Sequence, residues 1–186
     1  MVSNDSCGAR IEKQGLIQIY TGDGKGKSTA AIGQAIRAAG HNLKVGFISF
    51  FKDPDVFGYG EYASLQKLGI PTFIFARKHP HFYKDINLDD VREECLSGVE
   101  FIKELFHDQS WDMLVLDEID IVIRDGFLKE DEVLSLLETK PENLELILTG
   151  RGATKRMIEK ADLVSEVKEI KHPYEQGISS RKGIEY

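Results

Sequence analysis

The chain has 186 residues, of which 24 are Lys or Arg and 31 are Asp or Glu, so its formal net charge is −7. This length suits one domain, and 41% hydrophobic residues suffice for a core without disulfides or structural metals. The acidic balance argues against nucleic-acid binding along phosphates, which requires clustered Lys and Arg. Apolar runs such as residues 113–116 are far shorter than the roughly 20 residues that cross a bilayer.

We expect residues 1–15 to be a mobile N-terminal extension and residues 16–186 to form a single domain. The first residues lack the positive start and the apolar stretch of a secretory signal, which predicts a cytoplasmic protein. Cys7 and Cys95 are the only cysteines and form no CxxC pattern. We therefore expect two free thiols rather than a zinc site or a disulfide framework.

Short continuous apolar runs alternate with longer stretches of helical period, which is typical of an α/β fold. Six of the runs are rich in β-branched and aromatic residues and predict buried parallel strands. They are residues 16–20, 44–50, 72–75, 113–116, 145–149 and 163–170.

A helix is predicted directly after the first strand, where apolar residues have the spacing i, i+3, i+4 and i+7: Ile32, Ala35, Ile36 and Ala39. Gly40 is expected to end it in the left-handed conformation. Asn87 is the predicted N-cap of a longer helix that ends near His107. That helix should bury Val91, Cys95, Val99, Ile102 and Phe106.

Shorter helices are predicted at residues 61–68, 130–137 and 154–160. Residues 51–60 and 76–86 remain as irregular segments. Because ligands of an open parallel sheet bind beyond the carboxyl ends of its strands, both segments are candidate substrate loops.

Residues 21–29 read TGDGKGKST between the first strand and the first helix, close to the Walker A pattern GxxxxGK[ST]. Glycines let backbone N–H groups point at anionic oxygens, and the helix N-terminus adds partial positive charge. Lys27 would reach phosphate oxygens, and the Ser28 hydroxyl would bind Mg²⁺. The predicted ATP-binding residues are Gly22, Asp23, Gly24, Lys25, Gly26, Lys27, Ser28 and Thr29.

Thr21 departs from this pattern, which requires glycine at its position. Gly22, Gly24 and Gly26 supply the flexibility that the missing glycine would give. The alternative, a flexible turn that binds nothing, leaves Lys25, Lys27 and the two hydroxyls without a reason.

An apolar run at residues 114–116 ends in Asp117 and Glu118, as a Walker B element does. A hard divalent cation on phosphates binds one or two carboxylates plus waters. We therefore predict a metal site formed by Asp117, Glu118 and Ser28. The alternative is a strand that ends in two solvated acids.

Four stretches of the chain are more specific: TGDGKGKSTAAIGQAIRAAGH, VLDEID, LTGRGATKRMIEKADLVSEV and KHPYEQGISSRKGIEY. Together they resemble the ATP:corrinoid adenosyltransferases of the CobA/BtuR type, over most of the chain from Leu16 to Tyr186. The two C-terminal stretches are the most diagnostic part. The resemblance implies a P-loop NTPase-like, RecA-like fold with a mostly parallel sheet flanked by helices.

This resemblance implies transfer of the 5′-deoxyadenosyl group of ATP to the cobalt(I) of a reduced corrinoid, with release of triphosphate, in cobalamin biosynthesis or salvage. The family's nucleotide lies reversed in the loop, so Lys27 and Glu118 would act as catalytic residues on a triphosphate leaving group. Glu118 is the better metal ligand, for Mg²⁺ or Mn²⁺. Cobalt(I) is itself a strong nucleophile, so no general base is needed. A homodimer and a flavodoxin-type reductant are also implied.

Family members often have Gly-Phe-Thr-Trp after the third strand, whose aromatics help to displace the lower axial base of cobalt. Residues 76–83 read ARKHPHFY here and contain no tryptophan. We predict that Phe82 or Tyr83 takes that role and that Arg151 contacts phosphate or corrinoid. The alternatives are a surface loop with exposed aromatics and a structural ion pair for Arg151. His79 and His81 are predicted to be a solvated pair rather than metal ligands.

Two other functions compete with this interpretation. An ordinary P-loop kinase or ATPase would attack the γ-phosphate and yield ADP or free phosphate. A corrinoid- or nucleotide-binding regulator without catalysis would explain the altered loop at residues 76–83.

Overall fold

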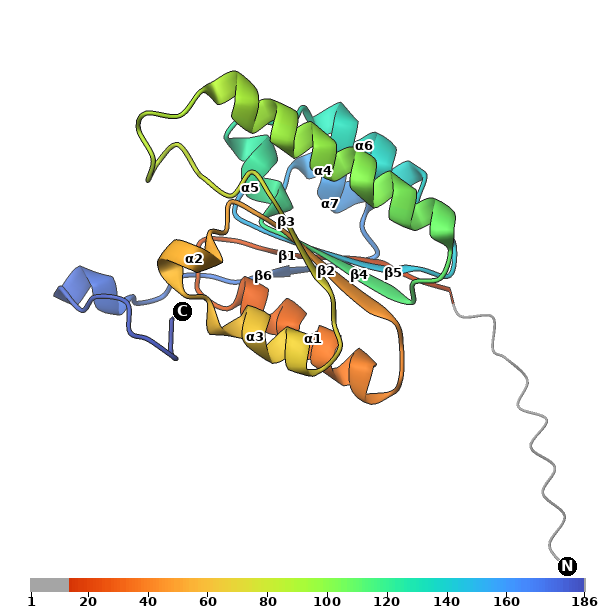
Figure 1. The fold of residues 1–186 in the computed structure, drawn as a ribbon, viewed down its shortest axis with the longest axis horizontal. Helices are drawn as coiled ribbons and strands as arrows, with labels where there is room; N and C mark the ends of the chain where they lie inside the picture. Colours follow the sequence, from red (N-terminus) through yellow and green to blue (C-terminus); the bar gives the residue numbers. More distant parts are fainter. Residues whose placement is uncertain (1–13, 186) are drawn as a thin grey trace, which may run out of the picture.

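A computed structural model describes residues 14–185 of the chain (Figure 1). Most of the expected N-terminal extension, and Cys7 with it, lies outside the described residues. Cys95 is buried and free, as predicted. None of the described helices is long and apolar enough to span a membrane.

Six parallel strands form one sheet in the order β3-β2-β4-β5-β1-β6, which confirms the predicted parallel sheet. β5 therefore separates β1, which leads into the phosphate loop, from β4, which carries the two acids. The strands are β1 (Ile17–Thr21), β2 (Val45–Phe50), β3 (Thr72–Phe75), β4 (Met113–Asp117), β5 (Glu145–Thr149) and β6 (Leu163–Glu166).

The two edge strands differ from the prediction of buried strands. β3 is half-buried and β6 is mostly exposed, because each pairs with a neighbour on one side only. β6 also ends at Glu166 and does not reach residue 170. Its last contact with β1 is the bond that Val167 N donates to Thr21 O at 2.8 Å. Beyond Thr21 the chain turns into the phosphate loop, so residues 168–170 have no strand to pair with.

Helices cover both faces of the sheet (Figure 1), and each face has its own apolar core. α1 and α3 lie on one face, and α4, α5, α6 and α7 lie on the other. The helices are α1 (Lys27–Gly40), α2 (Pro54–Phe57), α3 (Gly60–Lys67), α4 (Leu88–Asp108), α5 (Ile119–Arg124), α6 (Glu130–Glu138) and α7 (Lys155–Lys160), with a 3₁₀ turn η1 (Pro173–Gln176).

The packing face of α1 is narrower than its predicted apolar stripe. Ile36 is 40% exposed, and the helix instead buries alanines, whose small side chains allow close approach to the sheet: Ala31, Ala35 and Ala38. Gly40 remains helical, and Asn42 adopts the left-handed conformation two residues later (φ 59°). Asn is the residue after Gly that tolerates this conformation best.

The prediction for α4 is confirmed. Asn87 is its N-cap, and the Oδ1 atom accepts a hydrogen bond from Asp89 N at 2.9 Å. All five apolar residues predicted to face the core are buried. The short helices α2 and α5 were not predicted, because α2 has only four residues and α5 consists mostly of β-branched residues, which favour strands.

Candidate active site

The phosphate loop between β1 and α1 is shaped by backbone contacts. Gly22 and Gly26 have φ values of 99° and 124°, a region that favours glycine. A Cβ atom on Gly22 would lie 2.5 Å from Val167 O. Gly24 N donates to that same Val167 O at 2.8 Å. Backbone contacts therefore hold the loop against the segment that follows β6.

Lys27 is a desolvated cation at the first turn of α1. It is 8% exposed, and its ammonium group donates a hydrogen bond to Gly24 O at 2.7 Å. Burial lowers the pKa of Lys27, Glu118 raises it, and Arg151 lowers it further, with a net decrease. Lys27, Glu118 and Arg151 thus share one electrostatic environment.

Thr21, the departure from the Walker A pattern, has a structural role. It is the last residue of β1 and is 7% exposed. Its Oγ1 atom accepts a hydrogen bond from Ala153 N at 3.2 Å. The hydroxyl therefore links the phosphate loop to the loop that follows β5, a contact that glycine could not make.

Asp117 and Glu118 play different parts at the end of β4. Asp117 Oδ1 accepts a hydrogen bond at 2.7 Å from the hydroxyl of Thr149, which in turn accepts one from Glu118 N at 3.0 Å. Glu118 adopts a left-handed backbone conformation (φ 65°) between β4 and α5. Its Oε2 atom is buried without a hydrogen-bond partner among the described residues. Burial first, and then Asp117, raise the pKa of Glu118. Of the two acids, Glu118 therefore has the carboxylate oxygen, Oε2, that remains available to bind a ligand.

Lys52 was missed by sequence reasoning and lies beside both acids. Its ammonium nitrogen is 3.9 Å from Asp117 Oδ2, 3.7 Å from Glu118 Oε1 and 4.8 Å from the centre of the Tyr59 ring. Burial lowers the pKa of Lys52, but the two carboxylates outweigh burial and raise it overall. In the sequence, Lys52 is simply a lysine two residues after the end of a strand. This position places it beside the acids of β4 because β2 pairs with β4 in the sheet.

Asp120 was also missed. It is fully buried in the first turn of α5, and neither carboxylate oxygen has a hydrogen-bond partner within residues 14–185. Burial, and then Glu118, raise its pKa to about 8. In the sequence, its only distinguishing feature is its position two residues after the Walker B acids.

Of the other predicted residues, Arg151 is exposed on the loop after β5 and forms no ion pair within the described part of the chain. This finding does not support the alternative of a structural ion pair. Lys25 lies toward the C-terminal segment, with its ammonium nitrogen 3.3 Å from Ile184 O and 3.4 Å from Glu185 Oε1.

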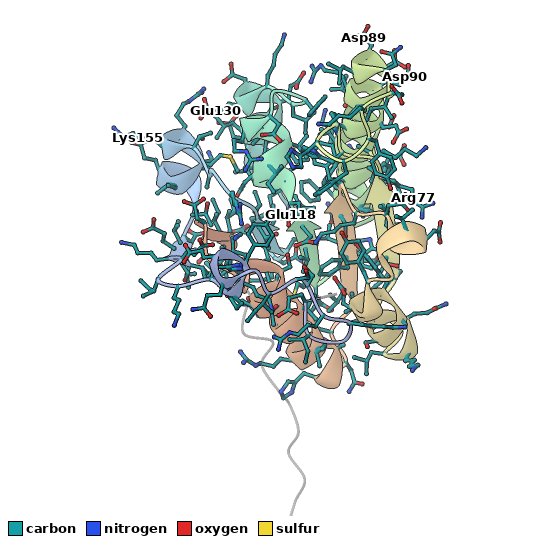
Figure 2. All side chains as sticks on the ribbon, turned by 90° about the vertical axis from the view of Figure 1, so that its left-hand side faces the viewer. Arg77, Asp89, Asp90, Glu118, Glu130 and Lys155 are labelled. Carbon is teal, nitrogen blue, oxygen red and sulfur yellow. The ribbon has the colours of Figure 1, made fainter. Side chains whose placement is uncertain are left out.

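The predicted metal ligands suit a hard cation. Ser28, Asp117 and Glu118 offer only oxygen atoms, which Mg²⁺ and Mn²⁺ prefer. The unpartnered Oε2 atom of Glu118 is consistent with such a ligand. No group of three or more His, Cys, Asp or Glu side chains among the described residues is arranged to hold a metal without further ligands. Such a site would be completed by phosphates and water. Figure 2 shows Glu118 near the middle of the molecule.

The loop at residues 76–86 is fixed to the same edge of the sheet through His79. The Nδ1 atom of His79 accepts a hydrogen bond from His81 N at 2.9 Å, so Nε2 carries the proton and donates to Asp125 Oδ2 at 2.8 Å. The His79 ring also packs 4.4 Å from the Phe51 ring. The prediction of a solvated histidine pair is therefore wrong for His79, because both of its ring nitrogens are engaged within the protein.

The two candidate aromatics of this loop occupy different environments. Tyr83 is half-buried, and its hydroxyl donates to Asp53 Oδ2 at 3.1 Å. Arg77 donates to the other oxygen of Asp53 at 3.3 Å. Phe82 is 65% exposed, with its ring 5.0 Å from that of His81. Tyr83 thus anchors the loop, while Phe82 faces outward from it.

Comparisons with known proteins agree with one another. The family described as "ATP:corrinoid adenosyltransferase BtuR/CobO/CobP" matches residues 13–186. The "Corrinoid adenosyltransferase" of Escherichia coli (strain K12) is 34% identical over 175 residues, which cover 94% of this chain and 87% of that protein. The same values hold for "Corrinoid adenosyltransferase CobA" of Salmonella typhimurium. The solved structure of flagellar accessory protein FlaH from Methanocaldococcus jannaschii has a TM-score of 0.50 at 13% identity, covers 83% of this chain and 71% of its own, and supports the fold alone.

Proposed function

The chain belongs to the ATP:corrinoid adenosyltransferase family, and we propose that its active site lies between the phosphate loop and the ends of β2, β4 and β5. The enzyme transfers the 5′-deoxyadenosyl group of ATP to the cobalt(I) of a reduced corrinoid and releases triphosphate. The electron pair of cobalt forms the bond to C5′, and the C5′–O bond breaks with its pair leaving on the triphosphate. A kinase, an ATPase and a non-catalytic regulator do not fit this membership.

The single observation that supports the proposed site is that the buried ammonium group of Lys27 lies at the glycine loop, on Gly24 O, and interacts electrostatically with Glu118 and Arg151. A triphosphate in the loop would take the place of Gly24 O as the acceptor for the Lys27 ammonium group. Loop N–H groups and the α1 N-terminus would add fixed positive potential. Charges that are already oriented and partly desolvated stabilise a leaving group without reorganisation cost. Lys27 would therefore promote cleavage of the C5′–O bond by stabilising the negative charge that develops on the triphosphate.

We further propose that Ser28 and Glu118 hold Mg²⁺ or Mn²⁺, with Asp117 beside them. The cation would supply additional positive charge to the triphosphate. Asp117 already accepts a hydrogen bond from Thr149, so its main effect would be to fix the turn that presents Glu118.

On the corrinoid side the protein need not provide a base, because the nucleophile is cobalt itself. Phe82 is exposed on a loop that His79 and Tyr83 anchor, which suits an apolar contact with the flat face of the macrocycle. Such a contact would exclude water from the axial position. By analogy with the family, the proposal also includes a homodimer and an external electron donor of the flavodoxin type.

An absorbance assay tests the assignment of Glu118. Wild-type protein, ATP and chemically reduced cobalamin are mixed anaerobically, and the loss of the cobalt(I) absorbance is followed. We expect Glu118→Gln to slow this loss by about 10²-fold, as for removal of one electrostatic partner of the reacting charge. Glu130→Gln, on the surface of α6, is the matched control and should react as the wild type does. A Glu118→Gln variant with wild-type turnover would overturn the assignment.

A further inference from the structure

Asp120 is the least satisfied polar side chain of the described region. Its exposed fraction is 0%, and both carboxylate oxygens are without a hydrogen-bond partner among residues 14–185. Buried polar groups in native proteins are nearly always hydrogen-bonded, because leaving them unpaired costs free energy. A buried carboxyl group without hydrogen bonds destabilises the protein unless a bound group donates hydrogen bonds to it.

The surroundings of Asp120 belong to the proposed active site. Glu118 is two residues away across the β4–α5 turn, and both Glu118 and Lys27 interact electrostatically with the Asp120 carboxylate. The loop after β5 lies directly against it, since a Cβ atom on Gly150 would be 2.7 Å from Asp120 Cβ and 3.0 Å from Asp120 N. Asp120 is therefore packed against the loop after β5 and interacts electrostatically with two proposed site residues, yet no described residue forms a hydrogen bond with its carboxylate.

We propose that Asp120 is a positioning residue that accepts hydrogen bonds from water molecules on the divalent cation held by Ser28 and Glu118. The inference rests on the proposed active site and adds a residue to it. Mg²⁺ gives up its waters reluctantly and usually keeps several of them in protein sites. Those waters are donors, and Asp120 is a buried acceptor with two unused oxygens beside the proposed ligand Glu118.

A direct metal–carboxylate bond is the less suitable role for Asp120. No group of three or more acidic, His or Cys side chains converges on one point in the described structure. A purely structural role is also disfavoured, because a structural carboxylate would accept a hydrogen bond from a neighbour, as Asp117 does from Thr149.

Two measurements test the inference. The first is Mn²⁺ affinity in the presence of ATP and without corrinoid, measured by electron paramagnetic resonance. We expect Asp120→Asn to weaken this affinity by about 10-fold or more, the usual effect of losing an outer-shell partner. The second is the Tm of the nucleotide-free protein, which should stay within about 2 °C of the wild-type value, because Asp120 has no hydrogen bond among the described residues to lose and Asn keeps the shape.

Asp90→Asn, on the exposed first turn of α4, is the control and should leave Mn²⁺ affinity unchanged. Asp120→Ala provides a second variant that removes both oxygens, and it should also weaken Mn²⁺ binding. A lower Tm with wild-type Mn²⁺ affinity in both Asp120 variants would overturn the inference and assign Asp120 a structural role.

Glu118→Gln separates this inference from the proposed function. If Glu118→Gln loses Mn²⁺ affinity while both Asp120 variants bind like the wild type, the metal site stands and the role of Asp120 is wrong. If Glu118→Gln also binds Mn²⁺ like the wild type, the proposed metal site and the inference fail together.

Discussion

The proposed phosphate side and the proposed corrinoid side of the site are built in different ways. On the phosphate side, backbone bonds join the glycine loop to residue Val167, and a buried Thr149–Asp117 hydrogen bond fixes the acids. On the corrinoid side, residues 76–86 are held by side-chain pairs near the surface, such as Tyr83 with Asp53 and His79 with Asp125. Stabilisation of a leaving group requires dipoles that are fixed in place. Binding of a large flat substrate is more compatible with a surface loop, whose conformation can change more easily.

The largest effect is expected on the phosphate side, from Lys27→Ala. We predict that kcat for cobalt(I) consumption falls by about 10³-fold, because the buried cation that meets the leaving group is lost. The Tm should not fall, since burial already disfavours the charged lysine. Lys155→Ala, on the exposed surface of α7, is the control, and its effect on kcat should be far smaller. Near-normal turnover of Lys27→Ala would contradict the leaving-group role.

Lys52→Met tests whether the acids of β4 depend on a counter-charge. Removing one partner leaves Asp117 and Glu118 as a partly buried, like-charged pair, so we predict a loss of about 3 kcal/mol in the free energy of unfolding. Urea denaturation measures this loss, and added MgATP should restore part of it. Lys44→Met removes an exposed ion pair with Asp108 and should cost less than about 1 kcal/mol. Equal losses in the two variants would mean that Lys52 has no special role.

Asp125→Asn weakens the anchor of the corrinoid loop and leaves the phosphate side intact. Loss of a charge-assisted hydrogen bond to His79 should raise the KM for the corrinoid by about 10-fold. The KM for ATP should stay at its wild-type value. An increase in the KM for ATP alone would show that the two sides are not separable in this way.

The same carboxylate gives a pH dependence with a definite sign. A hydrogen bond from Arg124, and a weaker contribution from His79, lower the pKa of Asp125. Its stabilising contribution is therefore fully present above the unfolded pKa, about 3.9, and is lost as pH falls through the lower folded value. The stability difference between wild type and Asp125→Asn should be constant from about pH 5 to 8 and should shrink below about pH 4. A difference that grows on acidification would contradict this assignment.

The smallest effect on stability is expected from Phe82→Ala. The side chain is 65% exposed, so the free energy of unfolding should change by less than about 0.5 kcal/mol. The KM for the corrinoid should rise severalfold if Phe82 contacts the macrocycle. Unchanged kinetics with every corrinoid tested would remove Phe82 from the site.

The sequence signals for the proposed phosphate side are local. Glycine spacing, the lysine before a helix and two acids after an apolar run are each read within a few residues. Lys52 and Thr149 could not be assigned in the same way, because their partners come from other strands and depend on the sheet order. Asp120 could not be assigned either, because its complete burial is visible only in the folded chain. The early end of β6 has the same origin, since it depends on where β1 turns into the loop.

The most direct test of the central claim is ³¹P NMR of the complete reaction with ATP and reduced corrinoid. We predict inorganic triphosphate in equal amount to the adenosylated corrinoid, because the loop and Lys27 stabilise the whole polyphosphate as the leaving group. ADP and free phosphate as the main products, with the corrinoid unchanged, would contradict the account.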